Sequence, residues 1–513
     1  MSLFPAKTAD DTSVALSRLD LDFFSQWVFR EKYPNAPFHK RWYDATQNPE
    51  VTRAINIAPR NSGKTTCFAK KGPLWLLGHN IDLKILLISR TLGRARSNLR
   101  FIRMNIEEND RLQRVFPALK QGVPWSDDDI TVQNNRMDGE ASVLARGLEG
   151  SITGFRSDLI IVDDLIDKTN VGSDIQRTKV NEYWDEQVLP TLNPDGRVFI
   201  VGTLYSNRDW YTRMLESEGY KENKYVFPAF KLDENKELVL DENSLPISYW
   251  PERWPTPKLL QRKDEVTSTE GSIAFQCQYM ADASGYTGQL FKSEWLTFYS
   301  YDELMGHFND LDFIMSVDPN ISEEARSDNT SMVTIAVDRR HNDVYVLDIF
   351  AEPLGFVEQV KKMKEYATRT QFKVGKHYLP GEQYIRKVGV EAIAYQRSLS
   401  ATGYMMGLPI EEVQHGRLDK VTRIMRIQPH IENGRIKFPD PELYPECRWW
   451  GPFLDEYLSF PRGRRDDRMD ALEIAISVAD LTSSGSTIPY GPGGGDDSAW
   501  RVLPMVKGRL LSG

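Results

Sequence analysis

Residues 54–65 read Ala54-Ile-Asn-Ile-Ala-Pro-Arg-Asn-Ser-Gly-Lys-Thr65, an apolar run that leads into a polar loop. The part from Ala58 to Thr65 matches the phosphate loop G-x-x-x-x-G-K-[ST], except that Ala58 replaces the first glycine. Backbone N–H groups of such a loop, at a helix N-terminus, bind anionic phosphate oxygens. We therefore predict a nucleotide site built from Arg60, Asn61, Ser62, Gly63, Lys64, Thr65 and Thr66.

Each loop residue has a distinct predicted contribution. Lys64 would reach the β and γ phosphates, and Thr65 would hold Mg²⁺. Gly63 lets the backbone approach the phosphates closely. Arg60 is unusual inside the loop and is a candidate contact to the γ-phosphate. The alternative is a strand–turn–helix with an incidental Gly-Lys-Thr.

A phosphate loop predicts a second strand that ends in acid, and Leu159-Ile-Ile-Val-Asp-Asp164 supplies one. Asp163 would bind Mg²⁺ through water, and Asp164 would orient the attacking water. Two adjacent carboxylates after a buried strand are unfavourable without a cation, although a helix N-cap would explain one of them. After the next strand, Thr203 is a candidate sensor of the γ-phosphate.

The spacing of short apolar runs predicts the organisation of the N-terminal half. Runs rich in Ile and Val alternate with helix-compatible stretches, which is typical of a doubly wound, mainly parallel α/β sheet. The runs are 54–58, 83–89, 159–162, 198–201 and 225–227. An acidic stretch, 231–243, then reads as a connection between domains, or alternatively as an exposed hairpin within one domain.

The second half begins with three strand-like runs, 313–317, 332–337 and 344–349, separated by short gaps. A helix-compatible stretch (356–370), a strand (388–390) and more helix follow. The order β-β-β-α-β-α is that of an RNase H-like domain with a mixed sheet. The predicted domains are 1–230, a connection at 231–295, a second domain at 296–482, and a flexible C-terminal tail at 483–513.

Acidic residues follow the strands of this second half. Asp318 ends the first strand and Glu391 ends the later one. Asp466, Asp467 and Asp470 open a helix, where Asp470 shares a face with the other two. Acids from two strands and one helix can hold two Mg²⁺ or Mn²⁺ ions for phosphodiester cleavage. Favourable interaction with the helix dipole is the alternative explanation for Asp466 and Asp467.

Composition limits the class of protein. Three cysteines without paired spacing argue against a disulfide framework and favour a reducing compartment, and no apolar run is long enough for a membrane span. The start of the chain lacks the pattern of a secretory signal. The net charge of −9 is unfavourable for nucleic acid, but basic residues gather at 90–103, 462–468 and 501–509. We expect weak, salt-sensitive DNA binding by the isolated chain.

Taken in order, the motifs resemble those of the large terminase subunit of tailed bacteriophages, the DNA-packaging motor. They are APRNSGKTT, GSITGFRSDLIIVDD, VGTLY, IAFQCQYM, GQLFKSEWL, SVDP, VGVEAI and DDRMDAL. The resemblance covers about Pro37 to Asp480 and implies an N-terminal RecA-like P-loop ATPase domain with lid elements and a C-terminal RNase H-like nuclease domain.

The resemblance also implies roles for individual residues. Lys64, Thr65 and Asp163 look like ligands of ATP and Mg²⁺, with Asp164, Arg60 and Thr203 as catalytic and coupling groups. Relatives often carry Glu at the position of Asp164. Asp318, Glu391 and Asp470 resemble nuclease metal ligands, and either Asp466 or Asp467 joins them. Arg156 is a candidate arginine finger for a neighbouring subunit.

The implied mechanism is a ring of subunits on the portal protein of a procapsid, in the cytoplasm of an infected bacterium. ATP hydrolysis would move double-stranded DNA into the procapsid, and the nuclease would cut concatemers. A small terminase subunit would bring the DNA. The alternatives are a P-loop DNA helicase or translocase without nuclease activity, and a non-enzymatic DNA-binding scaffold.

Overall fold

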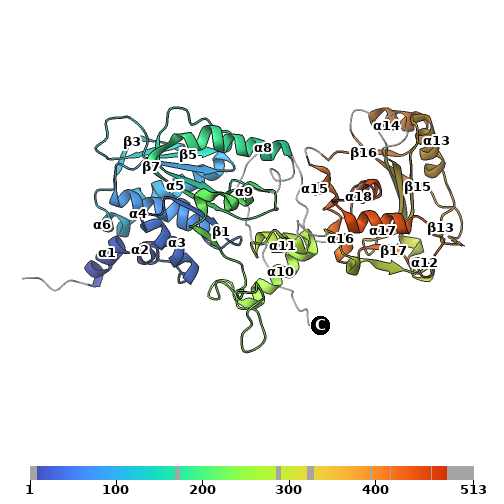
Figure 1. Ribbon diagram of the computed structural model, residues 1–513, viewed down its shortest axis with the longest axis horizontal. Helices are drawn as coiled ribbons and strands as arrows, with labels where there is room; N and C mark the ends of the chain where they lie inside the picture. Colours follow the sequence, from blue (N-terminus) through green and yellow to red (C-terminus); the bar gives the residue numbers. More distant parts are fainter. Residues whose placement is uncertain are drawn as a thin grey trace, which may run out of the picture.

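The computed structural model describes residues 9–167, 174–284, 290–319, 329–392, 396–415, 418–463 and 465–481. Within these ranges the chain forms two units, each built on its own sheet, with a helical segment between them (Figure 1). The expected tail at 483–513, and with it Arg501, Lys507 and Arg509, lies outside the described residues. None of the helices in the described ranges has the length and apolar character that a bilayer crossing requires.

The N-terminal sheet has eight strands in the order β3-β4-β5-β2-β6-β7-β1-β8. Every neighbouring pair from β5 to β8 in this order is parallel, whereas β3, β4 and β5 pair antiparallel. This confirms the predicted mainly parallel, RecA-like α/β class. The strands are β1 (Arg53–Ile57), β2 (Ile85–Ser89), β3 (Gln121–Trp125), β4 (Asp129–Val132), β5 (Val143–Gly147), β6 (Ser157–Asp163), β7 (Leu192–Gly202) and β8 (Lys224–Val226).

Helices bury both faces of this sheet, because successive side chains of each strand point to opposite faces. On β1, Ile55 and Ile57 join one apolar cluster, and Ala54 joins the other. The first cluster packs against α8 (Asp174–Glu182), η2 (Tyr183–Val188) and α9 (Trp210–Glu216). The second packs against α1 (Ala9–Leu19), α2 (Leu21–Trp27), α3 (Pro37–Gln47), η1 (Thr66–Lys71), α4 (Gly72–His79), α5 (Leu92–Glu108) and α6 (Asp110–Val115).

The C-terminal sheet has seven strands in the order β16-β15-β10-β11-β12-β17-β9. The meander β10-β11-β12 is antiparallel, and β15 lies parallel to β10, which confirms the predicted mixed, RNase H-like class. The strands are β9 (Thr297–Tyr299), β10 (Leu311–Asp318), β11 (Thr330–Asp338), β12 (Asp343–Glu352), β15 (Ile385–Glu391), β16 (Ile410–Val413) and β17 (Ile436–Pro439), with β13 (Lys373–Val374) and β14 (His377–Tyr378) forming a separate pair.

One long helix, α18 (Asp467–Ala479), packs across β10, β11 and β15. Its apolar side chains, including Leu472 and Ala475, are buried. The approach is close at Gly389, where an added Cβ would lie 2.6 Å from Val478 Cγ2. Helices α13 (Phe356–Ala367) and α14 (Gln396–Met405) cover the opposite face, and α12 (Tyr301–Gly306), α15 (Lys420–Ile424), α16 (Gln428–Glu432) and α17 (Trp450–Ser459) complete the unit.

The acidic segment that was expected to connect the domains folds back on itself. Antiparallel bridges join Phe230 to Ser248, Leu232 to Leu238 and Leu240 to Pro246, so the segment turns back on itself, as in the hairpin interpretation. The helices α10 (Thr256–Glu270) and α11 (Ser272–Gln278) follow and lie between the two units (Figure 1). The Ser272 N–H donates to Glu432 Oε2 of α16 at 3.0 Å. The predicted domain limits stay a prediction.

Candidate functional site

The predicted phosphate loop lies between β1 and the helical turn η1, as the sequence indicated. Asn61 has φ 61° and Gly63 has φ 89°, so two of its residues are in the left-handed region. Glycine adopts this region without strain, and asparagine tolerates it. The loop therefore curves tightly, and Lys64 and Thr65 follow it at the start of the helix.

The loop and the acidic strand meet as predicted. Thr65 Oγ1 donates to Asp163 Oδ1 at 2.7 Å, and Asn98 Nδ2 donates to Asp163 Oδ2 at 3.0 Å. Asp163 is buried, and burial, followed by the charge of Asp164, raises the pKa of Asp163 to about 6. A raised pKa means that the environment disfavours the carboxylate until a cation lies beside it. These hard oxygen donors suit Mg²⁺.

Asp164 begins the loop after β6 and has φ 46°. Its carboxylate lies 3.6 Å from Lys64 Nζ and 3.4 Å from an Arg94 guanidinium nitrogen. Lys64 and Arg94 thus hold the Asp164 carboxylate beside the phosphate loop.

The remaining predicted residues of this site have other partners. Thr203 Oγ1 donates to the Ala58 carbonyl oxygen at 3.2 Å, which ties the end of β7 to the start of the loop. Arg60 donates to the Tyr205 hydroxyl at 3.0 Å. Arg156 is exposed, and its guanidinium donates to the Phe155 carbonyl oxygen.

A buried histidine, His39, contacts the backbone of the phosphate loop. His39 Nδ1 accepts from the Ala36 N–H at 2.9 Å, so Nε2 carries the ring proton and lies 2.7 Å from the Ser62 carbonyl oxygen. Trp250 packs against the ring, with centroids 4.5 Å apart. Burial lowers the pKa of His39 to about 4. The neutral ring therefore holds the loop backbone at neutral pH.

Acidification should destabilise the N-terminal unit through His39. A folded pKa of about 4 against 6.5 in the unfolded chain means that its stabilisation is present above pH 6.5 and is lost as pH falls toward 4. From pH 7 to pH 5 the loss is about 2 kcal/mol. Urea unfolding at pH 7 and at pH 5 should show this loss of stability, and His39→Gln should reduce the difference in stability between the two pH values. The exposed His377→Gln should leave it intact; equal pH dependence in wild type and His39→Gln would refute the assignment.

A second acidic site lies at one end of the C-terminal sheet. Val317 of β10 pairs with Val390 of β15, so Asp318 and Glu391 end neighbouring parallel strands. The start of α18 brings the remaining carboxylates to the same place. Burial, followed by the charges of Asp470, Asp467 and Glu391, raises the pKa of Asp318 well above its ordinary value. The predicted convergence of Asp318, Glu391, Asp467 and Asp470 is therefore present in the structure, with Asp466 at the N-cap of α18.

These residues fit divalent metal ions. Asp470 Oδ1 is buried and has no hydrogen-bond partner among the described residues, and the surrounding side chains supply carboxylate oxygens from three elements. Mg²⁺ and Mn²⁺ prefer such donors. Burial also raises the pKa of Glu473, one turn further along α18, to about 7.

Two cations in this second site were not predicted from the sequence. Lys420 Nζ lies 2.7 Å from Asp466 Oδ1 and 3.1 Å from Asp470 Oδ2. Arg423 donates to Glu391 Oε1 at 3.0 Å and lies 3.4 Å from Asp470 Oδ2. Both are on α15, a single helical turn. These two cations could have been found from the segment Asp419-Lys-Val-Thr-Arg423, in which an N-cap residue is followed by two cations on one helix face.

The arginines of the predicted basic segment 90–103 are mostly paired within the chain. On α5, Arg96 donates twice to Asp128, at 2.6 and 2.9 Å, and Arg103 lies 3.0 Å from Asp127. These two arginines thus have acidic partners within the chain. Arg468 pairs with Glu456 at 2.5 Å, Arg465 is exposed, and Arg464 lies outside the described residues.

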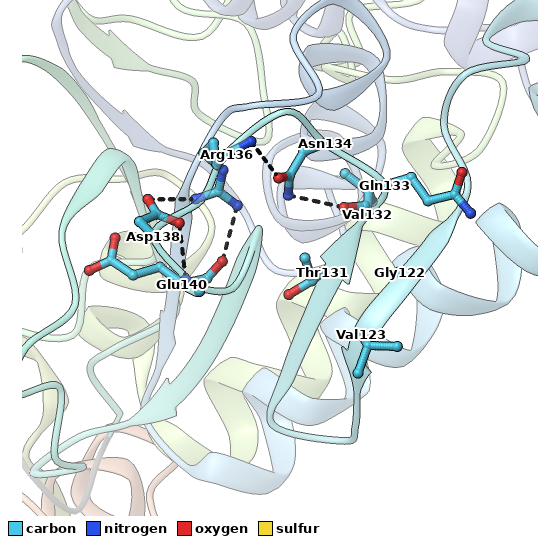
Figure 2. Close-up of a pocket in the computed structure, with 10 residues that line it drawn as sticks. Gly122, Val123, Thr131, Val132, Gln133, Asn134, Arg136, Asp138 and Glu140 are labelled. Carbon is cyan, nitrogen blue, oxygen red and sulfur yellow. Dashed lines mark hydrogen bonds and ion pairs between the residues drawn. The ribbon is translucent and has the colours of Figure 1, made fainter.

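A separate pocket of about 250 Å³ lies at the β3 edge of the N-terminal sheet (Figure 2). Arg136 crosses it, with contacts to Asp138 at 3.5 Å and to the Glu140 carbonyl oxygen at 3.1 Å. Its cation is thus already paired with acceptors of the same loop. Neither the phosphate loop nor the second acidic cluster contributes to its lining.

The fold and the two sites define a chain that joins a RecA-like P-loop unit to an RNase H-like unit. Residues 55–230 match the family model of the terminase large subunit, T4likevirus-type, N-terminal. The terminase large subunit of Enterobacteria phage T3 is 27% identical over 179 residues, 34% of this chain and 29% of the T3 protein. The resemblance to large terminase subunits is therefore confirmed.

Solved structures of large terminases are also similar. A large terminase from a thermophilic bacteriophage is 10% identical over 87% of this chain and 99% of that one, with a TM-score of 0.43. The HK97 bacteriophage large terminase is 13% identical over 92% of this chain and 100% of that one, with a TM-score of 0.36. The T3 match spans less than a third of that protein.

Proposed function

We propose that this chain is the motor subunit of viral DNA packaging, which hydrolyses ATP to move double-stranded DNA into a procapsid and cuts concatemeric DNA. The observation that carries the proposal is the presence of two separate sites on one chain. One pairs a phosphate loop with Asp163 and Asp164, and the other gathers Asp318, Glu391 and Asp470.

At the first site, the loop backbone and Lys64 would bind the phosphates of ATP. Thr65 and Asp163 would hold Mg²⁺, which shields phosphate charge when bound. Asp164, between Lys64 and Arg94, would orient the attacking water. Through its bond to the Ala58 carbonyl, Thr203 would pass movement of the loop to β7. Its exposure makes Arg156 a candidate to reach a neighbouring subunit.

At the second site, Asp318, Glu391 and Asp470, with Asp467 or Asp466, would hold two Mg²⁺ or Mn²⁺ ions. Bound there, such ions activate water and stabilise the leaving oxygen of a phosphodiester. The fold positions these carboxylates. Asp318 and Glu391 end the paired strands β10 and β15, and the other carboxylates lie at the start of α18. Asp467 also accepts from the Asn329 N–H, which orients its carboxylate.

The proposed partners follow from this function. They are double-stranded DNA, the portal protein of the procapsid, a small terminase subunit and further copies of the chain in a ring. The proposed location is the cytoplasm of the infected bacterium, without a membrane partner.

The test is a packaging assay with purified chain, portal-bearing procapsids, small subunit, ATP and duplex DNA. DNA should become resistant to added DNase only with ATP, and plasmid cleavage should need Mg²⁺ or Mn²⁺. Strand displacement without cleavage would instead support the helicase alternative. Absence of ATP hydrolysis with DNA and procapsids present would support the scaffold alternative.

A further inference from the structure

We infer that α15 is a cationic gate on the second acidic site and that the N-terminal unit holds this gate closed through Arg177. The inference rests on the proposed nuclease function of that site. It concerns three residues of one short segment: Asp419, which caps α15, and Lys420 and Arg423, which enter the carboxylate cluster.

The gate occupies the oxygens that metal ions would need. Asp470 Oδ2 lies 3.1 Å from Lys420 Nζ and 3.4 Å from an Arg423 nitrogen, so both cations share one carboxylate oxygen. Arg423 also holds Glu391 Oε1. The side chain of Arg423 is only 9% exposed, so its charge lies inside the protein beside the carboxylates.

A divalent ion and an ammonium or guanidinium group cannot share these oxygens favourably. At a few ångströms their mutual repulsion is strong, because burial leaves little water to screen it. In the metal-free chain the two cations replace part of the charge that metal ions would supply, and they stabilise neighbouring carboxylates. Metal binding therefore requires Lys420, and at least part of Arg423, to withdraw with α15. The gate should lower the affinity of the site for metal ions.

The position of α15 is linked to the N-terminal unit. Asp419 Oδ1 accepts from the Thr422 N–H at 2.8 Å and so caps the helix, while its other oxygen lies 3.2 Å from both terminal nitrogens of Arg177. Arg177 is on α8, the first described helix after the strand that ends in Asp163. Figure 1 shows α8 and α15 on the facing sides of the two units.

This ion pair is more than a solvated surface contact. The side chains of Arg177 and Asp419 are 13% and 24% exposed, and the arginine reaches one oxygen with two nitrogens. Partial burial strengthens such a pair relative to exposed ones. A shift of α8 that breaks the pair would release the cap residue of α15.

The experiment measures Mn²⁺ binding to the full-length, metal-free chain by calorimetry, without DNA or nucleotide. Lys420→Met keeps the length of the side chain but removes its charge, and it should tighten Mn²⁺ binding at least about 10-fold. Lys420→Arg, which keeps the charge, should bind as wild type does. The matched control is Lys387→Met, which removes a lysine of β15 that pairs with Glu411 at 2.9 Å, away from the site.

Arg177→Ala tests the link to the N-terminal unit. Arg177→Ala should also tighten Mn²⁺ binding, and Arg177→Lys should restore part of the wild-type value. The effect of Arg177→Ala should largely vanish in the Lys420→Met background. Unchanged or weaker binding by Lys420→Met overturns the gate. Tighter binding by Lys420→Met with no effect of Arg177→Ala overturns the link. Wild type that neither binds Mn²⁺ nor cuts DNA with it would instead refute the proposed nuclease site.

Melting in EDTA gives a second readout that does not depend on metal. Lys420→Met should lower the melting temperature of the C-terminal unit, because Asp466 and Asp470 lose a cation at 2.7 and 3.1 Å. Lys387→Met should change it less. A melting temperature that rises in Lys420→Met would show that the lysine does not neutralise the cluster, and would overturn the gate.

Discussion

Lys64→Ala is expected to lower ATP turnover by at least about 100-fold, since removing one donor aimed at developing charge costs two to three orders of magnitude. The Lys64 side chain is 6% exposed, and its ammonium lies 3.6 Å from Asp164. Bound phosphates would replace Asp164 as the partner of this ammonium. Without it, the loop would keep its backbone donors but lose its buried positive charge. Phosphate release in the presence of DNA measures the effect.

The same variant should retain Mn²⁺-dependent DNA cutting, because Asp318 and its neighbours belong to the other unit. Lys70→Ala is the matched control: it removes a lysine of η1, the helix that follows the loop, whose ammonium lies over the Phe101 ring. Its ATP turnover should remain near that of wild type. Loss of both ATPase and cutting in a folded Lys64→Ala variant would contradict the separation of the two sites.

Much of the fold could be predicted from the sequence, because buried parallel strands are compact apolar runs. All five runs of the N-terminal half became strands. The strands at 121–147 were missed, since Gln121–Trp125 contains Gly and Pro and Val143–Gly147 contains Arg146. Pairing with neighbouring strands overrides such weak local propensity. The acidic segment after Phe230 has the composition of a linker and of a hairpin alike, so only tertiary contacts distinguish them.

The acidic residues of both sites could also be predicted, because they follow strands that end at one edge of a sheet. Their partners could not. His39 and Asn98 come from helices far along the chain from the groups they contact, and nothing local separates them from ordinary polar residues. Lys420 and Arg423 likewise resemble solvated cations in the sequence. Their role depends on where α15 packs against α18, which is a property of the tertiary structure.

The basic residues of α5 illustrate the same limit. Arg96 and Arg103 are seven residues apart and lie on one side of α5, but Asp127 and Asp128 from the loop between β3 and β4 pair with them. A helical periodicity identifies which residues share a face and says nothing about what covers that face. The weak DNA affinity expected from the net charge is consistent with this pairing, since paired arginines release fewer counterions on binding.

Asp318→Asn is expected to reduce DNA cleavage by at least about 100-fold, while ATP turnover stays unchanged. Asparagine matches the shape of the side chain but loses the negative charge that would help to hold the metal ions. Burial raises the pKa of Asp318 well above its ordinary value, so the carboxylate destabilises the metal-free protein as pH rises. In EDTA at neutral pH, Asp318→Asn should therefore melt no lower than wild type, and lost cleavage cannot be attributed to unfolding.

The matched control for this variant is Asp312→Asn, on the same strand. Asp312 lies 2.9 Å from Arg339 and 2.8 Å from Arg386, at the opposite end of β10 from Asp318. Losing these partly exposed ion pairs should cost about 1 kcal/mol or less and should leave cleavage intact. Added Mn²⁺ should raise the melting temperature of wild type and Asp312→Asn, but much less that of Asp318→Asn. Persistent Mn²⁺-dependent cutting by Asp318→Asn would place the metal ions elsewhere.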